Sequence, residues 1–328
     1  MRKLTFIVAI LAALYAGYWF IGSSAVEKGV TGQIAKMNEA GWDITYSDLG
    51  TKGFPSRFDT SATDLSVTTP EAGFTWNVPF VQANALSYRP NSVIAVFPNQ
   101  QEIIVNGQPI VVNSDGLRAN LAVAAGTDLE LSNLTAEVGE MSLELPSGPL
   151  TSISSGLFAL RPAIAPLTYD AYLTLDNLDL PPALRALLDP RGTLPETLSQ
   201  TVIDAQITLD EKLDRHALAS KQLPLVDKVE LNSAAMTWGA LELRGTGEIT
   251  IDLGGVPTGQ ITLSATNWQQ MFDIALKIGA LDAQFGRTLR NAGLLLSGGS
   301  NDISIPLSFK GGNMFIGPIP AGAAPRFR

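Results

Sequence analysis

Cysteine is absent from this 328-residue sequence, and histidine occurs only once. The chain therefore has no disulfide framework, no thiolate nucleophile and no cysteine-based zinc or iron–sulfur site. A single histidine also excludes a histidine-rich metal centre. The folded body must be held together by packing and backbone hydrogen bonds.

Charged residues are scarce too, at 16% of the sequence, and the formal net charge is −9. No cluster of Lys and Arg follows the first three residues. Nucleic-acid phosphates require such clusters, so we expect no nucleic-acid partner. An acidic surface also repels anionic lipid headgroups.

Apolar residues, in contrast, make up 45% of the sequence, and 30 glycines and 20 prolines are spread along it. This composition is too apolar for a disordered chain. The glycines and prolines supply the frequent turns that many short strands require. We therefore expect a mainly β fold with minor α content.

An uncharged apolar run, Leu4–Ile21, follows Arg2 and Lys3. The run is near the lower limit of the roughly 17–25 residues that cross a bilayer as a helix. Two cations precede it and the next charge is Glu27. The positive-inside rule then predicts a single-pass helix with a cytoplasmic N-terminus and a periplasmic body.

Small residues at Ser23 and Ala25 leave a cleaved signal peptide as the alternative. The outer end of the apolar run is crowded with aromatic side chains, as in the interfacial belt of a retained helix. These are Tyr15, Tyr18, Trp19 and Phe20. We therefore expect residues 1–25 to form a membrane anchor, with the signal peptide as the other possibility.

Residues 26–40 carry apolar side chains at the spacing of an amphipathic helix. They are Val26, Val30, Ile34 and Met37. Gly41 is expected to end this helix. Residues 41–328 would form the β-rich domain, which could consist of two halves meeting near residues 190–225.

The body alternates apolar and polar residues, as strands with one buried face do. The clearest stretches are 169–175, 241–243, 249–253, 261–263 and 303–309. Asn106-Gly107 within residues 103–112 predicts a hairpin. Helical periodicity is confined to residues 183–188, 268–276 and 282–296, so we expect an elongated, curved antiparallel sheet or groove with short covering helices.

Several stretches resemble the bacterial family known as domain of unknown function 2125. They are residues 41–46 (GWDITY), 53–58 (GFPSRF), 255–261 (GVPTGQI), 267–268 (NW), 305–312 (IPLSFKGG) and 317–320 (GPIP). Each motif is short, and their order and spacing over nearly the whole chain carry the likeness. That family is distantly similar to the AsmA-like envelope proteins, which have one N-terminal anchor and a long periplasmic β-sheet.

The resemblance implies a bacterial inner-membrane location and a β-sheet body. Some larger AsmA-like proteins are implicated in phospholipid traffic between the two membranes. The resemblance brings no catalytic residues and no cofactor.

The chain's own candidates for chemistry are weak. His216 lies in a charged stretch without a G-x-S-x-G nucleophile motif, so a surface histidine is the favoured interpretation over a Ser-His-Asp triad. Asp210, Glu211 and Asp214 lack the spacing and central glycine of a calcium loop, which favours a solvated charged turn or helix start.

Three glycine motifs are also interpreted as structural. Gly245 and Gly247 lack the Lys-Ser or Lys-Thr of a phosphate loop and are interpreted as a hairpin turn. Gly53-Phe54-Pro55 and Gly255-Val256-Pro257 are expected where strands begin or bend. A functional alternative places Phe54 at the mouth of an apolar groove.

We accordingly predict no catalytic, cofactor or metal-site residues and no enzymatic activity. The first hypothesis is a protein that binds or guides lipid acyl chains in an apolar β-groove next to the inner membrane. The alternative is an envelope scaffold with a closed β core that recruits a protein partner through its surface or an edge strand.

Overall fold

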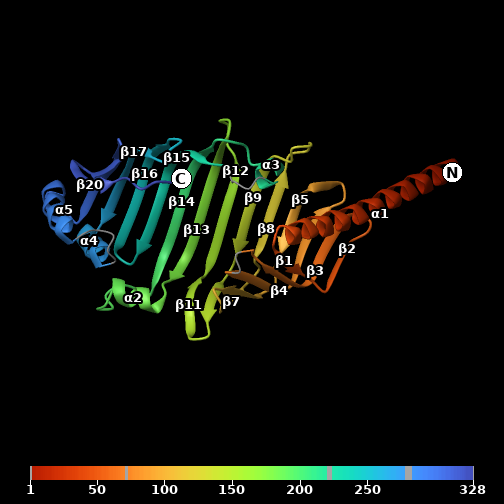
Figure 1. Ribbon diagram of the computed structural model, residues 1–328, viewed down its shortest axis with the longest axis horizontal. Coiled ribbons are helices and arrows are strands. Elements are labelled where there is room, and N and C mark those ends of the chain that lie inside the picture. The colour runs from red at the N-terminus through yellow and green to blue at the C-terminus, as the bar shows by residue number, and fades with distance from the viewer. Residues whose placement is uncertain (1, 71–72, 220–223, 278–282, 328) are drawn as a thin grey trace. The chain divides into compact units, whose positions relative to one another are not determined.

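A computed structural model describes residues 2–70, 73–219, 224–277 and 283–327 of the chain (Figure 1). Within these residues the protein has one long N-terminal helix, four shorter helices and twenty strands. The strand pairings whose register is described are antiparallel. The expected fold class, mainly β with an apolar helix before a large antiparallel sheet, is confirmed.

The chain divides into two compact units. Unit 1 comprises residues 1–125 and 132–149, and unit 2 comprises residues 126–131 and 150–328. The segment near 190–225, considered from the sequence as a meeting point of two halves, lies inside unit 2. There β13 (Thr168–Asp179) and β14 (Thr197–Leu209) pair along almost their whole length, so this segment is internal to one unit.

Helix α1 (Arg2–Glu39) is continuous, so the expected anchor and amphipathic segments form one helix. Its second part packs against unit 1 through a partly buried stripe, as its periodicity predicted. The stripe is Val26, Val30, Ile34 and Met37. The helix ends as expected before Gly41, which has a φ of 95° that favours glycine.

Unit 1 is built from strands that pair as often with more distant strands as with their sequence neighbours. They are β1 (Asp43–Thr45), β2 (Asp48–Lys52), β3 (Arg57–Thr68), β4 (Phe74–Leu86), β5 (Arg89–Val96), β6 (Gln100–Val105), β7 (Gln108–Ser114), β8 (Arg118–Val123) and β10 (Met141–Leu145). The β6–β7 hairpin turns at Asn106-Gly107 with positive φ at both residues, as predicted. The chain crosses between the units three times: after Ala125, within β9 (Leu131–Val138) and within β11 (Gly148–Ile153).

In unit 2, every strand from β12 to β20 pairs with the next one along the chain, which makes an antiparallel meander. Besides β13 and β14, the strands are β12 (Ser155–Pro162), β15 (Val226–Trp238), β16 (Leu241–Ile251), β17 (Pro257–Thr266), β18 (Asp302–Lys310), β19 (Asn313–Ile316) and β20 (Ile319–Ala323). The predicted strand after Gly255-Val256-Pro257 begins at Pro257.

The short helices are α2 (Pro182–Leu188), α3 (Arg215–Ala219), α4 (Trp268–Lys277) and α5 (Ala283–Leu296). Three of them fall where helical periodicity predicted them, except that Asp282 lies outside the described residues. Helices α2 and α4 contact each other at one end of the unit 2 sheet (Figure 1). They enclose a core cluster of Leu198, Trp238 and Leu241, as the expectation of short covering helices requires.

The interpretation of Gly245 and Gly247 as a hairpin turn was wrong. Both lie inside β16 and pair with β15 and β17. A Cβ atom on Gly247 would come within 2.2 Å of the Gln260 carbonyl oxygen. The glycine therefore permits a close approach of two neighbouring strands.

Candidate functional site

One face of the unit 2 sheet is apolar across seven of its strands, β12 to β18. The register joins side chains into rows that cross seven strands, and two adjacent rows contain only apolar residues or glycine. The first row is Phe158, Leu173, Ile203, Ala234, Gly245, Leu263 and Ile305. The second is Leu160, Ala171, Ala205, Leu231, Gly247, Ile261 and Leu307. We call these rows the apolar face.

The opposite face is polar, because successive side chains of a strand point to opposite sides. A row on that face carries a charged or polar side chain on each of seven strands. It is Arg161, Asp170, Gln206, Glu230, Glu248, Gln260 and Ser308. Lys228 donates hydrogen bonds to Glu248 and then to Glu230 on this side, and these bonds raise the pKa of the lysine. This side is suited to water.

The apolar face is closed at one end and open in its middle. At the closed end Leu241 is only 1% exposed under α2 and α4, and Trp238 donates its indole N–H to the Pro195 carbonyl at 2.8 Å. Near the middle of their strands, Ile203 on β14 is 38% exposed and Phe158 on β12 is 36% exposed, whereas Ala205 beside Ile203 is 4% exposed. Part of the apolar face is thus accessible on β12 and β14.

Unit 1 differs because α1 is fastened to its sheet by aromatic side chains. Tyr18 donates its hydroxyl to the Ser87 carbonyl at 2.6 Å, and Tyr15 shares a 2.8 Å hydrogen bond with the Ser87 hydroxyl. Trp19 donates its indole N–H to the Arg57 carbonyl at 2.7 Å. Three of the aromatics expected to form a membrane belt therefore hold Arg57 at the start of β3 and Ser87 in the turn before β5.

Aromatic rings complete this contact between α1 and unit 1. We call the whole contact the collar; its members are Tyr15, Tyr18, Trp19, Phe20, Phe54, Arg57, Phe58 and Ser87. Phe54 stacks on Phe20 with ring centroids 5.7 Å apart and meets Trp19 edge-on. Phe58 lies 5.8 Å from Trp19 and is buried. Phe54 is still 52% exposed, so an apolar ring of the Gly53-Phe54-Pro55 turn remains on the surface beside the helix.

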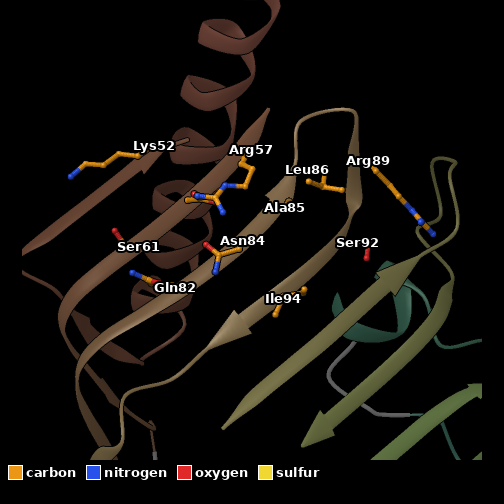
Figure 2. Close-up of a pocket in the computed structure, with 11 residues that line it drawn as sticks. Lys52, Arg57, Ser61, Gln82, Asn84, Ala85, Leu86, Arg89, Ser92 and Ile94 are labelled. Atoms are coloured by element: carbon orange, nitrogen blue, oxygen red, sulfur yellow. The ribbon is translucent and has the colours of Figure 1, made fainter. Parts of the chain in front are cut away.

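A hollow of about 710 Å³ lies on the side of the unit 1 strands that faces away from Phe58 and the helix (Figure 2). Three cations line it together with amides, hydroxyls and a little aliphatic surface: Lys52, Arg57, Asp59, Ser61, Gln82, Asn84, Ala85, Leu86, Arg89, Ser92 and Ile94. In Figure 2, side chains of β2, β3, β4 and β5 contribute to it. The hollow is adjacent to the collar, because Arg57 belongs to both.

The charges in the hollow are not balanced. Arg57 forms an ion pair with Asp59 at 2.8 Å. Lys52 and Arg89 have no carboxylate within ion-pair distance among the described residues. The Oδ1 atom of Asp59 is buried and has no hydrogen-bond partner in the described part of the chain. The hollow thus has a local excess of positive charge on a chain of net charge −9.

A family profile described as "Uncharacterized protein conserved in bacteria (DUF2125)" matches residues 19–325. The chain belongs to this family. No curated protein and no solved structure matches the chain. The matched region begins at Trp19, so the family region includes Trp19, Phe20, the hollow and the apolar face. The more distant likeness to AsmA-like proteins stays a prediction.

Among the described residues, His216 faces one carboxylate on the surface of the protein. His216 is exposed and its Nε2 atom lies 3.9 Å from the equally exposed Asp128 carboxylate. Asp214 accepts the backbone N–H groups of Ala217 and His216, which lowers its pKa. Asp214 therefore caps the short helix α3, in agreement with the expected helix start.

Asp210 and Lys212 of this stretch have separate structural partners, and Glu211 is exposed. Asp210 accepts the Leu225 backbone N–H at 2.6 Å. Lys212 forms an ion pair with Glu130 at 2.5 Å, which raises the pKa of the lysine. Within the described residues no group of three His, Asp or Glu side chains could hold a metal ion.

Sequence reasoning missed the hollow. Lys52, Arg57 and Arg89 are too far apart in the sequence to form a visible cluster, and the strand pairings β2–β3, β3–β4 and β4–β5 bring their segments together. The only signal for the hollow was a set of polar residues at alternate positions, 59 and 61 on β3 and 82 and 84 on β4. These residues can be seen to face one another only when the register of β3 and β4 is known.

Proposed function

We propose that this protein is a non-enzymatic, membrane-anchored protein of the bacterial envelope that binds lipid acyl chains on the apolar face of unit 2. The open middle of that face is the observation that supports it. Soluble antiparallel sheets normally cover such a face with a second layer, and exposed contiguous apolar surface is typical of a binding site. Here the surface is made of Leu, Ile, Ala and Gly with one aromatic ring, Phe158, and such side chains suit flexible aliphatic chains.

The N-terminal helix supports a membrane as the source of the ligand. Helix α1 is long and apolar enough to cross a bilayer, and only 6% of its most apolar window is buried in the protein. Its large apolar side chains, such as Leu4, Phe6 and Leu11, are mostly exposed. We propose that α1 is retained as a single-pass anchor in the inner membrane, with a cytoplasmic N-terminus and a periplasmic body.

The experiment that tests acyl-chain binding uses the full chain purified in a non-ionic detergent. Diacylglycerol is added, and bound molecules are counted by native mass spectrometry. Ile203→Glu places a charge in the open middle of the apolar face. We expect it to reduce bound diacylglycerol at least fivefold, because burying a charge beside an acyl chain is costly.

Val202→Glu is the matched control. Val202 is the preceding residue of β14 and points to the polar face, where it pairs with Thr174 and Ala235. This variant should bind as much diacylglycerol as the wild type. Equal binding by the Ile203 variant would refute the proposal.

The scaffold function remains the alternative. A photo-reactive amino acid at Ile203 in cells separates the two. Adducts with lipid would support acyl-chain binding, and one specific protein adduct without lipid would show that a protein covers the face.

A further inference from the structure

We infer that the hollow of unit 1 binds the phosphate of a membrane phospholipid headgroup, at the level where α1 leaves the bilayer. This inference rests on the proposed membrane anchoring of α1. It is separate from acyl-chain binding, because the hollow and the apolar face belong to different units.

The position of the hollow along α1 is the first step. The apolar run Leu4–Ile21 is roughly 27 Å long at about 1.5 Å per residue, close to the roughly 30 Å hydrocarbon core of a bilayer. The collar joins Tyr15, Tyr18 and Trp19 to Ser87 and Arg57. The turns around residues 53–57 and 86–89 therefore lie beside the outer end of the run.

The exposed side chains of these turns suit a membrane interface. Phe54 is 52% exposed and Tyr88 is 70% exposed, and both flank cationic residues. Aromatic rings concentrate at the level of the headgroups, and Lys and Arg extend their charges toward phosphates while their stems contact apolar surface. A spanning α1 thus brings the turns of unit 1 into the headgroup layer.

The chemistry of the hollow is the second step. Lys52 and Arg89 are without carboxylate partners among the described residues, and Arg57 adds a third cation. Arg and Lys are the side chains that best bind phosphate oxygens. Asp59 offsets only the charge of Arg57, with which it forms an ion pair. A phosphate group matches the remaining positive charge.

The test compares two lipids with the same acyl chains, phosphatidylglycerol and diacylglycerol. The full chain in a phosphate-free non-ionic detergent is titrated with each, and bound lipid is counted by native mass spectrometry. We expect at least tenfold tighter binding of phosphatidylglycerol. The double variant Lys52→Gln/Arg89→Gln should remove this preference and leave diacylglycerol binding unchanged.

Two controls sharpen the result. Lys52 and Arg89 are exposed, so their substitution should not alter the thermal unfolding of the protein. Arg191→Gln removes one positive charge from an exposed site in unit 2 and should keep the preference. Ile203→Glu, in contrast, should lower diacylglycerol binding and leave the tighter binding of phosphatidylglycerol at the hollow, because Ile203 lies in unit 2 and the hollow lies in unit 1. Failure of acyl-chain binding and failure of headgroup binding are therefore distinguishable.

Competition with inorganic phosphate shows whether the hollow binds the phosphate of a lipid headgroup or free phosphate. If phosphate fails to displace phosphatidylglycerol at equal concentration, the lipid headgroup is the ligand. Complete displacement would assign the same cations to free phosphate and overturn the lipid assignment. No preference in the wild type, or a preference that survives the double variant, would overturn the inference altogether.

Discussion

Both units carry an antiparallel sheet, and the two sheets differ in what covers their faces. In unit 1 the face that bears Phe58 is covered by α1, which is held by hydrogen bonds to two turns. In unit 2, α2 and α4 cover Trp238 and Leu241 at one end of the apolar face, whereas the side chain of Ile203 is partly exposed to solvent. The same alternation of apolar residues thus leads to a closed structural contact in one unit and an accessible surface in the other.

The largest expected effect is a difference in the free energy of unfolding between alanine variants at the covered end of the apolar face and at its exposed part. Leu241→Ala should lower the free energy of unfolding by about 2–5 kcal/mol, because the buried side chain leaves a cavity. Ile203→Ala should cost about 1 kcal/mol or less, because a half-exposed site leaves no enclosed cavity. Thermal unfolding of the full chain, followed by circular dichroism, measures both. Equal losses would mean that the middle of the face is covered in solution.

A smaller effect should sharpen the contrast at the contact of α1 with unit 1. A Cβ atom at Gly22 would lie 2.7 Å from the Phe58 ring, whereas one at Gly17 would meet nothing within 4 Å. Gly22→Ala should therefore destabilise the protein by about 1–3 kcal/mol through overpacking. Gly17→Ala should be neutral or slightly stabilising, since alanine favours helix. Indistinguishable unfolding curves for the two variants would argue against a docked α1.

The smallest effect concerns the loop that closes one end of the unit 2 sheet. The backbone N–H of Leu194 and then the Thr193 hydroxyl donate to Asp189, and the resulting pKa lies below its ordinary value of 3.8. The pKa of Asp189 is lower in the folded protein than in the unfolded chain. The ionised carboxylate therefore stabilises the folded protein at any pH above the unfolded-state pKa, and this stabilisation is lost as the pH falls through the folded-state pKa.

The pH dependence gives the measurement for that loop. Above about pH 5 the melting temperature of the wild type should exceed that of Asp189→Asn by a constant amount. The gap should narrow as the pH falls below 3.8, because the wild-type carboxylate becomes protonated. A gap that widens on acidification would contradict this role of Asp189.

Much of the fold was predictable because it depends on local patterns. The apolar side chains at alternate positions of residues 169–175, 261–263 and 303–309 were predicted to share one face of the sheet. The register confirms this prediction. The Asn106-Gly107 turn and the end of α1 before Gly41 depend on backbone conformations that neighbouring residues determine. The interpretation of Gly245 and Gly247 failed because glycine also serves where two strands approach closely.

The candidate sites were less predictable because they depend on non-local pairing. Lys52, Arg57 and Arg89 join one hollow only through the register of four strands, and Tyr15, Tyr18 and Trp19 find their partners at Ser87 and Arg57 only after folding. The sequence by itself determined an apolar helix followed by strands with one apolar face, since periodicity is a local property. Only the tertiary structure decided which part of that face is covered, because covering requires contacts between residues far apart in the chain.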